Sequence, residues 1–226
     1  MELEFKKDFA AARVNWDYFW CGKLARPAVA AVIPKPGVTP VAKPPYAAGH
    51  AGDFAPVMDQ IEQWAATHDF LGEAMPYYYL EFAADQFATF LGCDLTFPSP
   101  DAGGWPTHIY ADVPLSDIEI AFKPASPWWQ RVADFAGQLM ARFEGRLLIA
   151  GPTLVANLDA LVALRGAETV LLDLLESPDE VTRCLRDITV AHGKVLDELA
   201  TLLKMNRWGS ITRHGMYSSG RITVPQ

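Results

Sequence analysis

RLLIAGPTLVANLDALVALRGAETVLLDLLESPDEV, residues 146–181, holds the clearest signals for secondary structure in the chain. The apolar segment 146–150 has the length of a buried strand and runs directly into a Gly-Pro pair at 151–152. Apolar spacing over 158–164 indicates a helix, which Gly166 closes. The stretch therefore predicts a strand, a turn and a helix in succession, which is the repeating unit of α/β proteins.

The end of this stretch carries a strong signal for the start of another helix. Ser177 is a capping residue, a proline follows it, and Glu180 stands at the third helical position, which is the capping-box pattern. Apolar residues then recur along one face as far as about Lys204, so a long amphipathic helix is expected. Ser126 followed by proline starts a second helix in the same way, with a buried stripe over 127–143.

Residues 1–52 are predicted to form a helix, a strand and a long loop. Apolar residues at helical spacing from Phe5 to Phe19 indicate the helix. The apolar and partly β-branched run 28–33 is interpreted as a buried strand, the first strand of a barrel. Prolines then cluster over 34–52, where they cannot donate backbone hydrogen bonds, and this predicts a loop.

The next part of the chain is expected to add a second strand between two helices. Helical spacing is found around 58–64 and again over 83–91, where Gly92 ends the pattern. Between them, the aromatic run 77–82 has high β-propensity. Three tyrosines at 77–79 would alternate between the two faces of this strand, and core packing is the default expectation for them.

Repeated strand–helix units predict a single α/β domain over residues 1–226, of the (β/α)₈ TIM-barrel type. A complete barrel takes about 250 residues, and only about four or five strand–helix units can be placed in this chain. Residues 210–212 and 221–224 are expected to be extended, without a helix after them. The expected barrel is therefore incomplete, and its last strand would leave an unpaired edge that invites association.

Composition narrows the classes of partner and compartment. The formal net charge is -8, with no run of five or more like charges, so neither a nucleic-acid footprint nor a basic membrane patch is expected. No stretch of 18 residues is free of charge or proline, which argues against a membrane span. Three widely spaced cysteines do not suggest a disulfide framework, and a reducing cytoplasm is the expected location.

Several motifs taken in order resemble the central segment of the uroporphyrinogen decarboxylase family. They are GPTL at 151–154, LDAL at 158–161, LRGAE at 164–168 and DLLESPDEV at 173–181, with RP at 26–27 and FATFLG at 87–92 upstream. The resemblance implies a β/α barrel. It also implies either a decarboxylase that needs no cofactor or a methyltransferase of the corrinoid-dependent branch, which uses zinc and a corrinoid protein.

The sequence departs from the family pattern in three places. Where family decarboxylases carry an arginine-rich motif after the first strand, this chain has PKPG at 34–37. Glu81 or Asp85 stands near the place of the family's acidic residue, and Asn157 near the place of its tyrosine. The late serine, the histidine and the zinc ligands of the family would lie beyond Gln226. The substrate is therefore expected to be a carboxylated, porphyrinogen-like or methylated small molecule, with the methyltransferase branch slightly favoured.

Loops that follow barrel strands supply the candidate site residues. Arg213, His214 and Tyr217 combine a fixed cation, a group that titrates near neutrality and a phenol. We expect Arg213 to bind substrate, and His214 and Tyr217 to be catalytic. The alternative is a solvated loop without a role, since glycines at 209, 215 and 220 flank these residues.

Four further candidates each have a structural alternative. Asp159 is a catalytic candidate and Asn157 a substrate-binding one, although one of them is expected to cap a helix. Arg165 could bind substrate, or complement a helix dipole or pair with Glu168. Trp105 could stack on a planar ligand, or anchor a loop by packing.

No metal site can be identified from the sequence, because the five histidines show no ligand spacing with each other or with a cysteine. Zinc and a corrinoid are expected only if the methyltransferase branch applies. The expected partner is a small-molecule substrate, with a corrinoid protein, a second copy of the chain or a missing C-terminal half as the other candidates. A catalytically inert fragment that needs such a partner is the alternative to an enzyme.

Overall fold

A computed structural model describes residues 2–98 and 103–221 of the chain. Its helices are α1 (Phe9–Trp20), α2 (Ala55–Thr67), α3 (Gln86–Phe90), α4 (Pro127–Phe143), α5 (Asn157–Arg165), α6 (Ala167–Glu176), α7 (Pro178–Leu202) and α8 (Met205–Trp208). Its strands are β1 (Ala30–Pro34), β2 (His68–Gly72), β3 (Tyr77–Tyr79), β4 (Leu95–Thr96), β5 (Trp105–Pro106), β6 (Leu148–Ala150), β7 (Ser210–Ile211) and β8 (Tyr217–Ser218), and a short 3₁₀ helix spans Leu115–Asp117.

The centre of the fold is the parallel pair β3 and β6, two segments that the sequence predicted to be strands. Tyr78 is in register with Ile149, and α4 lies between the two strands in the chain, as a parallel crossover requires. Tyr78 is buried and its ring meets Phe135 of α4 edge-on, with 5.9 Å between ring centroids. The neighbours Tyr77 and Tyr79 are half-buried on the opposite face. The molecule is therefore an α/β protein, as expected.

The two long helices were predicted well, although only one of the two caps forms. Ser126 Oγ accepts a hydrogen bond from the backbone N of Trp129 at 3.4 Å and so caps α4. Ser177 makes no side-chain cap hydrogen bond at the start of α7, so the capping-box prediction is wrong. Helix α7 forms because one face, which includes Val181 and Ile188, is buried against the rest of the molecule.

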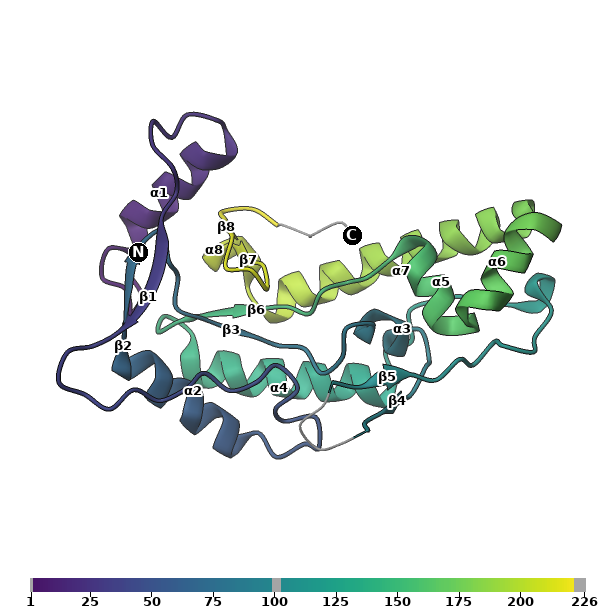
Figure 1. The fold of residues 1–226 in the computed structure, drawn as a ribbon, viewed down its shortest axis with the longest axis horizontal. Helices are drawn as coiled ribbons and strands as arrows, with labels where there is room; N and C mark the ends of the chain where they lie inside the picture. Colours follow the sequence, from purple (N-terminus) through teal and green to yellow (C-terminus); the bar gives the residue numbers. More distant parts are fainter. Residues whose placement is uncertain (1, 99–102, 222–226) are drawn as a thin grey trace.

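The strand at the N-terminal end does not belong to a barrel. β1 pairs in antiparallel fashion with β2, Val32 opposite Phe70, and most of β1 is exposed, so its interpretation as a buried first barrel strand is wrong. Figure 1 shows α1, β1 and β2 together at one end of the molecule, away from α5 and α6. The buried Lys6 ammonium donates to the carbonyl of Phe70 at 2.9 Å and closes the outer edge of β2.

The C-terminal strands form a small hairpin. β7 pairs with β8 in antiparallel fashion, and β7 also runs beside β6. Residues 210 and 211 are extended as predicted, while the extended segment expected at 221–224 lies almost entirely outside the described residues. Within residues 2–98 and 103–221, all named strands belong to two-stranded sheets, and they do not close into a barrel. None of the helices in these ranges has the length and hydropathy that crossing a membrane requires.

Candidate functional site

The carboxyl ends of β3 and β6 bring three polar side chains together. Tyr79 ends β3, Glu81 follows two residues later, and Thr153 lies in the turn after β6. The backbone N of Thr153 donates to Glu81 Oε2 at 2.8 Å. Tyr79 Oη also donates to Glu81 Oε2 and lies 2.7 Å from Thr153 Oγ1. Ligands of parallel α/β sheets bind outside this end of the strands, so the cluster has the expected position for a site.

Glu81 is the titratable group at the centre of this cluster. Its side chain is 2% exposed, and no described lysine or arginine forms an ion pair with it. Burial raises the pKa of Glu81 to about 7, because it disfavours the charged carboxylate, while the donors from Tyr79 and Thr153 lower the pKa only in part. A carboxyl group with this pKa can hold or release a proton at neutral pH, as a general acid or base must.

Tyr79 serves Glu81 as a hydrogen-bond donor. Burial and the nearby carboxylate both raise the pKa of the Tyr79 phenol, so it stays protonated at neutral pH. Its hydroxyl is fixed by Thr153, whose backbone N also donates to Tyr79 Oη at 3.2 Å. Glu81 Oε2 is therefore held by two donors, the hydroxyl of Tyr79 and the backbone N of Thr153.

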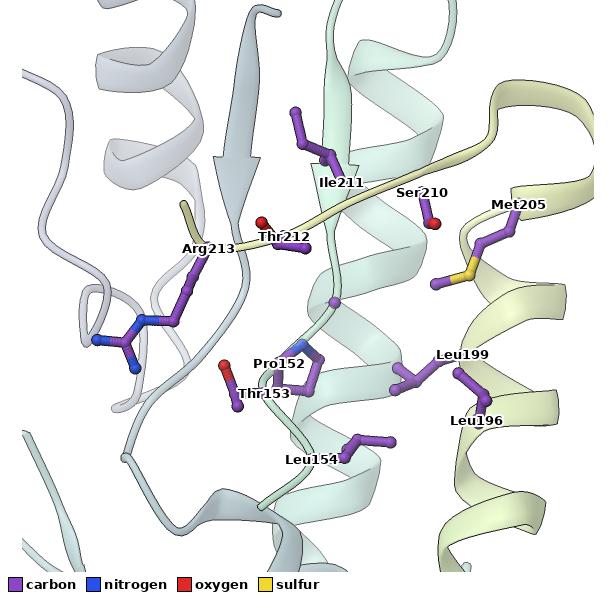
Figure 2. A pocket seen from close by; sticks show the side chains of 11 residues that line it. Pro152, Thr153, Leu154, Leu196, Leu199, Met205, Ser210, Ile211, Thr212 and Arg213 are labelled. Atoms are coloured by element: carbon purple, nitrogen blue, oxygen red, sulfur yellow. The ribbon is translucent and has the colours of Figure 1, made fainter. Parts of the chain in front are cut away.

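A pocket opens next to Thr153. It has a volume of about 40 Å³ for the centre of a water-sized atom, and about 480 Å³ when all space between atoms and open solvent is counted. The turn after β6, helices α7 and α8, and the segment 210–213 supply its walls. Figure 2 shows Thr153 between two kinds of side chain, with Arg213 on one side and Leu196, Leu199 and Met205 on the other. Glu81 does not itself line this pocket, and it contacts the pocket-lining residue Thr153 through the backbone N of that residue.

Arg213 lies where the sequence analysis expected a substrate-binding cation. Its side chain is exposed, lines the pocket, and makes no hydrogen bond or ion pair with the described residues. Its charge lowers the pKa of Glu81, which places the two groups within electrostatic reach of each other. The backbone carbonyl of Arg213 accepts a hydrogen bond from Tyr77 Oη at 2.8 Å, which anchors the segment to β3.

The neighbouring catalytic candidates do not join the cluster. His214 is exposed and does not line the pocket, and its backbone N donates to Thr212 Oγ1 at 3.3 Å. Tyr217 is fully buried, and its hydroxyl donates to the carbonyl of Trp208 at 2.8 Å. Burial raises the pKa of Tyr217 to about 12. His214 therefore lies on a surface loop and Tyr217 packs in the interior, so neither residue is part of the site proposed below.

Asn157 and Asp159 begin α5, close in sequence to the turn that carries Thr153. Asn157 has φ +56° and its side chain is exposed. Neither side chain caps the helix, because Ala156 occupies the capping position without a side-chain hydrogen bond, so the expectation of a cap is wrong. Asp159 is exposed. Burial raises the pKa of Asp85, and the nearby charge of Asp159 raises it further.

Trp105 lies at the same end of β3 as Glu81. The adjacent Gly104 donates its backbone N to the carbonyl of Phe82 at 3.2 Å, so strand β5 runs beside the extension of β3. The side chain of Trp105 is 63% exposed, which leaves its face free to contact a ligand. Stacking on a planar ligand remains a prediction for this residue.

Arg165 has a structural role in this fold. Its buried guanidinium binds Asp173 through two hydrogen bonds, at 2.5 and 3.1 Å, and donates to the carbonyls of Tyr110 and Val113. The pairing with Glu168 that the sequence suggested is replaced by the pairing with Asp173 of α6. Arg165 therefore ties the loop before the 3₁₀ helix to α5 and α6, and it does not line the pocket.

Sequence reasoning identified Arg213 and named Glu81 as one of two acidic candidates, but it missed the roles of Tyr79 and Thr153. The available signal was the spacing of Tyr79 and Glu81 at the end of one predicted strand, together with Thr153 in the turn after another. No group of three histidine, cysteine or acidic side chains suited to a metal ion is found among residues 2–98 and 103–221. Comparison of the chain with protein-family models, curated proteins and solved structures found no match.

Proposed function

We propose that this chain carries the active site of an enzyme of the uroporphyrinogen decarboxylase type. In this proposal its strands β3 and β6 belong to a barrel of the (β/α)₈ type, which does not close within the described residues. The substrate is a carboxylated or methylated small molecule, and of these we favour the carboxylated class. One observation carries the proposal: Glu81 is buried without a cation partner at the carboxyl end of β3, and its pKa is about 7.

Proton transfer by Glu81 is the chemistry that this arrangement supports best. In a decarboxylation, the bond between the reacting carbon and the carboxylate breaks, carbon dioxide leaves, and the electron pair stays on the carbon. Protonated Glu81 would donate its proton to that carbon and regain one from water. Tyr79 and the backbone N of Thr153 would stabilise the carboxylate that forms, since both donate to Glu81 Oε2.

Arg213 supports the choice of an anionic substrate. It lines the pocket beside Thr153, and it makes no ion pair with the described residues. A guanidinium presents several donors in a fixed plane, which suits a carboxylate. The methyltransferase branch would need a zinc site, and the described residues do not supply three grouped ligands for one, so no step through zinc is derived.

The test is an activity assay with a matched pair of variants. The purified chain is incubated with uroporphyrinogen, and in a second arm with methylcobalamin and a thiol. We expect carbon dioxide release in the first arm, falling as the pH rises through about 7 because Glu81 loses its proton. Glu81→Gln should lower the rate on the order of 10²-fold or more, while the control Asp85→Asn should change it little.

Two results would contradict the proposal. Equal rates for Glu81→Gln and the unaltered chain would remove Glu81 from the chemistry. Turnover in the methylcobalamin arm alone would replace the carboxylated substrate by a methylated one.

A further inference from the structure

Helix α6 exposes leucines on its outer side. Leu171, Leu172 and Leu175 are 62%, 57% and 82% exposed, and Val170 alone among the residues of this helix is buried. Leu175 stands three and four residues after the other two, so it lies beside both of them on the helix surface. These three residues form what we call the leucine patch. An apolar patch of this kind on a folded protein marks a contact surface.

The inner side of α6 is polar, which reverses the usual arrangement of a surface helix. Asp173 accepts two hydrogen bonds from Arg165, at 2.5 and 3.1 Å, and the two side chains are only 14% and 7% exposed. Separating such a pair would leave a buried charge without its partner. Helix α6 therefore cannot turn about its axis to bury its leucines without breaking this ion pair. The leucine patch is held facing outwards.

Two carboxylates border the leucine patch. Glu168 precedes Leu171 and Leu172 by three and four residues, and Glu176 follows Leu172 by four residues. Residues at these spacings are neighbours on a helix surface, so the two glutamates lie at opposite ends of the patch. Both glutamate side chains are exposed. The contact surface of α6 is therefore apolar in its middle and acidic at its ends.

The charges around the leucine patch select among possible partners. The stretch 166–182, which is described throughout, contains no lysine or arginine. The arginines on either side of it are engaged, since Arg165 binds Asp173 and Arg183 binds Glu180. The acidic border therefore suits a partner with basic residues. A second copy of this chain would bring the same border and a net charge of -8, and an anionic membrane surface would also repel it.

We propose that α6 docks an amphipathic helix of a protein partner, with apolar residues on its contact face and lysine or arginine beside them. Recognition between helices uses apolar anchors spaced three and four residues apart, as in the leucine patch. Glu168 and Glu176 are about 12 Å apart along the helix axis, so the matching basic residues of the partner would lie about two turns apart. The inference uses neither Glu81 nor the pocket beside Thr153, and it is independent of the proposed function.

Binding of two labelled peptides to the full chain, followed by fluorescence anisotropy, tests the inference. The probe is a helical peptide of about 18 residues with leucine on one face and lysine on the other. The second peptide carries glutamate in place of lysine. We expect the lysine peptide to bind at least about tenfold more tightly than the glutamate peptide. Its affinity should fall as salt is added, because salt screens exposed charges.

Variants of α6 separate the apolar contribution from the charges. Leu171→Ser combined with Leu175→Ser should weaken binding of the lysine peptide on the order of tenfold or more, because apolar contact is lost. Glu168→Gln combined with Glu176→Gln should weaken it roughly threefold and reduce its salt dependence. Leu71→Ser is the matched control, since Leu71 is 48% exposed on β2 at the other end of the molecule (Figure 1). This control should bind like the unaltered chain.

Three results would overturn the inference. The first is equal binding of the two peptides, or binding that the paired leucine variant leaves unchanged. The second is a dimer in light scattering that the paired leucine variant abolishes, which would make a second copy the partner. The third is leucine-dependent sedimentation with vesicles of phosphatidylcholine and phosphatidylserine, which would make a membrane the partner. Glu81→Gln should bind the lysine peptide normally, so a failure of the proposed function is distinguishable from a failure here.

Discussion

Two buried glutamates, one after β2 and one after β3, have pKa values that are shifted in opposite directions. Glu73 follows β2 at the N-terminal end and is 1% exposed, and Glu81 follows β3 and is 2% exposed. Glu73 accepts hydrogen bonds from Arg26 at 2.5 and 2.9 Å, from Asn15 at 3.0 Å and from the backbone N of Val29 at 2.7 Å. These donors, with Arg26 the strongest, lower the pKa of Glu73 to about 2 despite its burial.

Glu81 has donors but no cation in contact with it, and burial raises its pKa to about 7. The comparison shows that burial by itself does not decide the state of a carboxyl group; the partner does. Glu73 is built to stay charged, and it ties α1, β1 and β2 together. Glu81 is built to exchange a proton at neutral pH. The paired carboxylate of Glu73 stabilises the fold. The charged form of Glu81, which is buried without a cation in contact, destabilises it.

The largest effect is expected from breaking the Glu73 cluster. Glu73→Ala removes the acceptors of four hydrogen bonds, two of them from a guanidinium, and should lower the free energy of unfolding by about 3 kcal/mol at pH 7. The measurement is urea denaturation followed by tryptophan fluorescence. Arg26→Ala is the comparison variant and should also destabilise, since it leaves Glu73 buried without its cation. A loss below about 0.5 kcal/mol in Glu73→Ala would show that the cluster does not hold the N-terminal end.

The second effect concerns the dependence of stability on pH. The folded-state pKa of Glu81 is raised, so the stability that it contributes is fully present below about pH 4.5 and is lost as the pH rises to about 7. Through this group the unaltered chain should lose about 2 kcal/mol over that window, and Glu81→Gln should not. The Glu73 contribution is lost in the other direction, as the pH falls from about 4.5 to about 2. Equal slopes between pH 5 and pH 7 for the two chains would contradict this account.

A smaller effect is expected from the charge of Arg213. Because this charge lowers the pKa of Glu81, Arg213→Gln should raise that pKa by a fraction of a unit. Arg213→Lys keeps the charge and should leave the pKa nearly unchanged. The measurement is a carboxyl ¹³C NMR titration, and a lowered pKa in Arg213→Gln would place Arg213 away from Glu81.

A further pair of variants separates two adjacent tyrosines, and Tyr79 should change the pKa of Glu81 more than Arg213 does. Tyr79→Phe removes a donor to Glu81 and should raise the pKa of Glu81 further. Tyr78 is the control, because its buried hydroxyl has no hydrogen-bond partner in the described part of the chain, and Tyr78→Phe should stabilise the fold by up to about 1 kcal/mol. The same NMR titration and urea denaturation apply. A shift of the Glu81 pKa in Tyr78→Phe but not in Tyr79→Phe would contradict the assignment of Tyr79 as the donor to Glu81.

The long helices and the central strands could be predicted because their signals are local, whereas α6 and α8 were not predicted. Helix α4 has a capping serine, a proline at its first position and a long apolar stripe, and β3 and β6 are short apolar or aromatic runs next to turn signals. The N-terminal strand was misassigned because its partner β2, His68–Gly72, starts directly after α2 and has no alternating pattern of its own. An apolar run is consistent with a buried strand, but whether anything covers it depends on tertiary contacts.

The candidate site could be predicted only in part, for the same reason. Arg213 was named because it follows a predicted strand. Glu81 was named, as an alternative to Asp85, only from the resemblance to the family's acidic residue. Tyr217 resembled a catalytic phenol in the sequence, but packing against Phe9 and a hydrogen bond to Trp208 bury it. The meeting of Glu81 with Thr153, 72 residues later, depends on the parallel pairing of β3 and β6, which no local pattern encodes.

Titration of Glu81 itself tests most directly whether this carboxyl group can transfer a proton at neutral pH. Carboxyl ¹³C NMR of the chain labelled at glutamate, with Glu81→Gln to assign the resonance, reports the pKa of this group alone. We predict a midpoint near pH 7 for Glu81, and none above pH 3 for Glu73 in the same spectra. A midpoint for Glu81 at or below the ordinary glutamate value of about 4.5 would contradict its role in proton transfer.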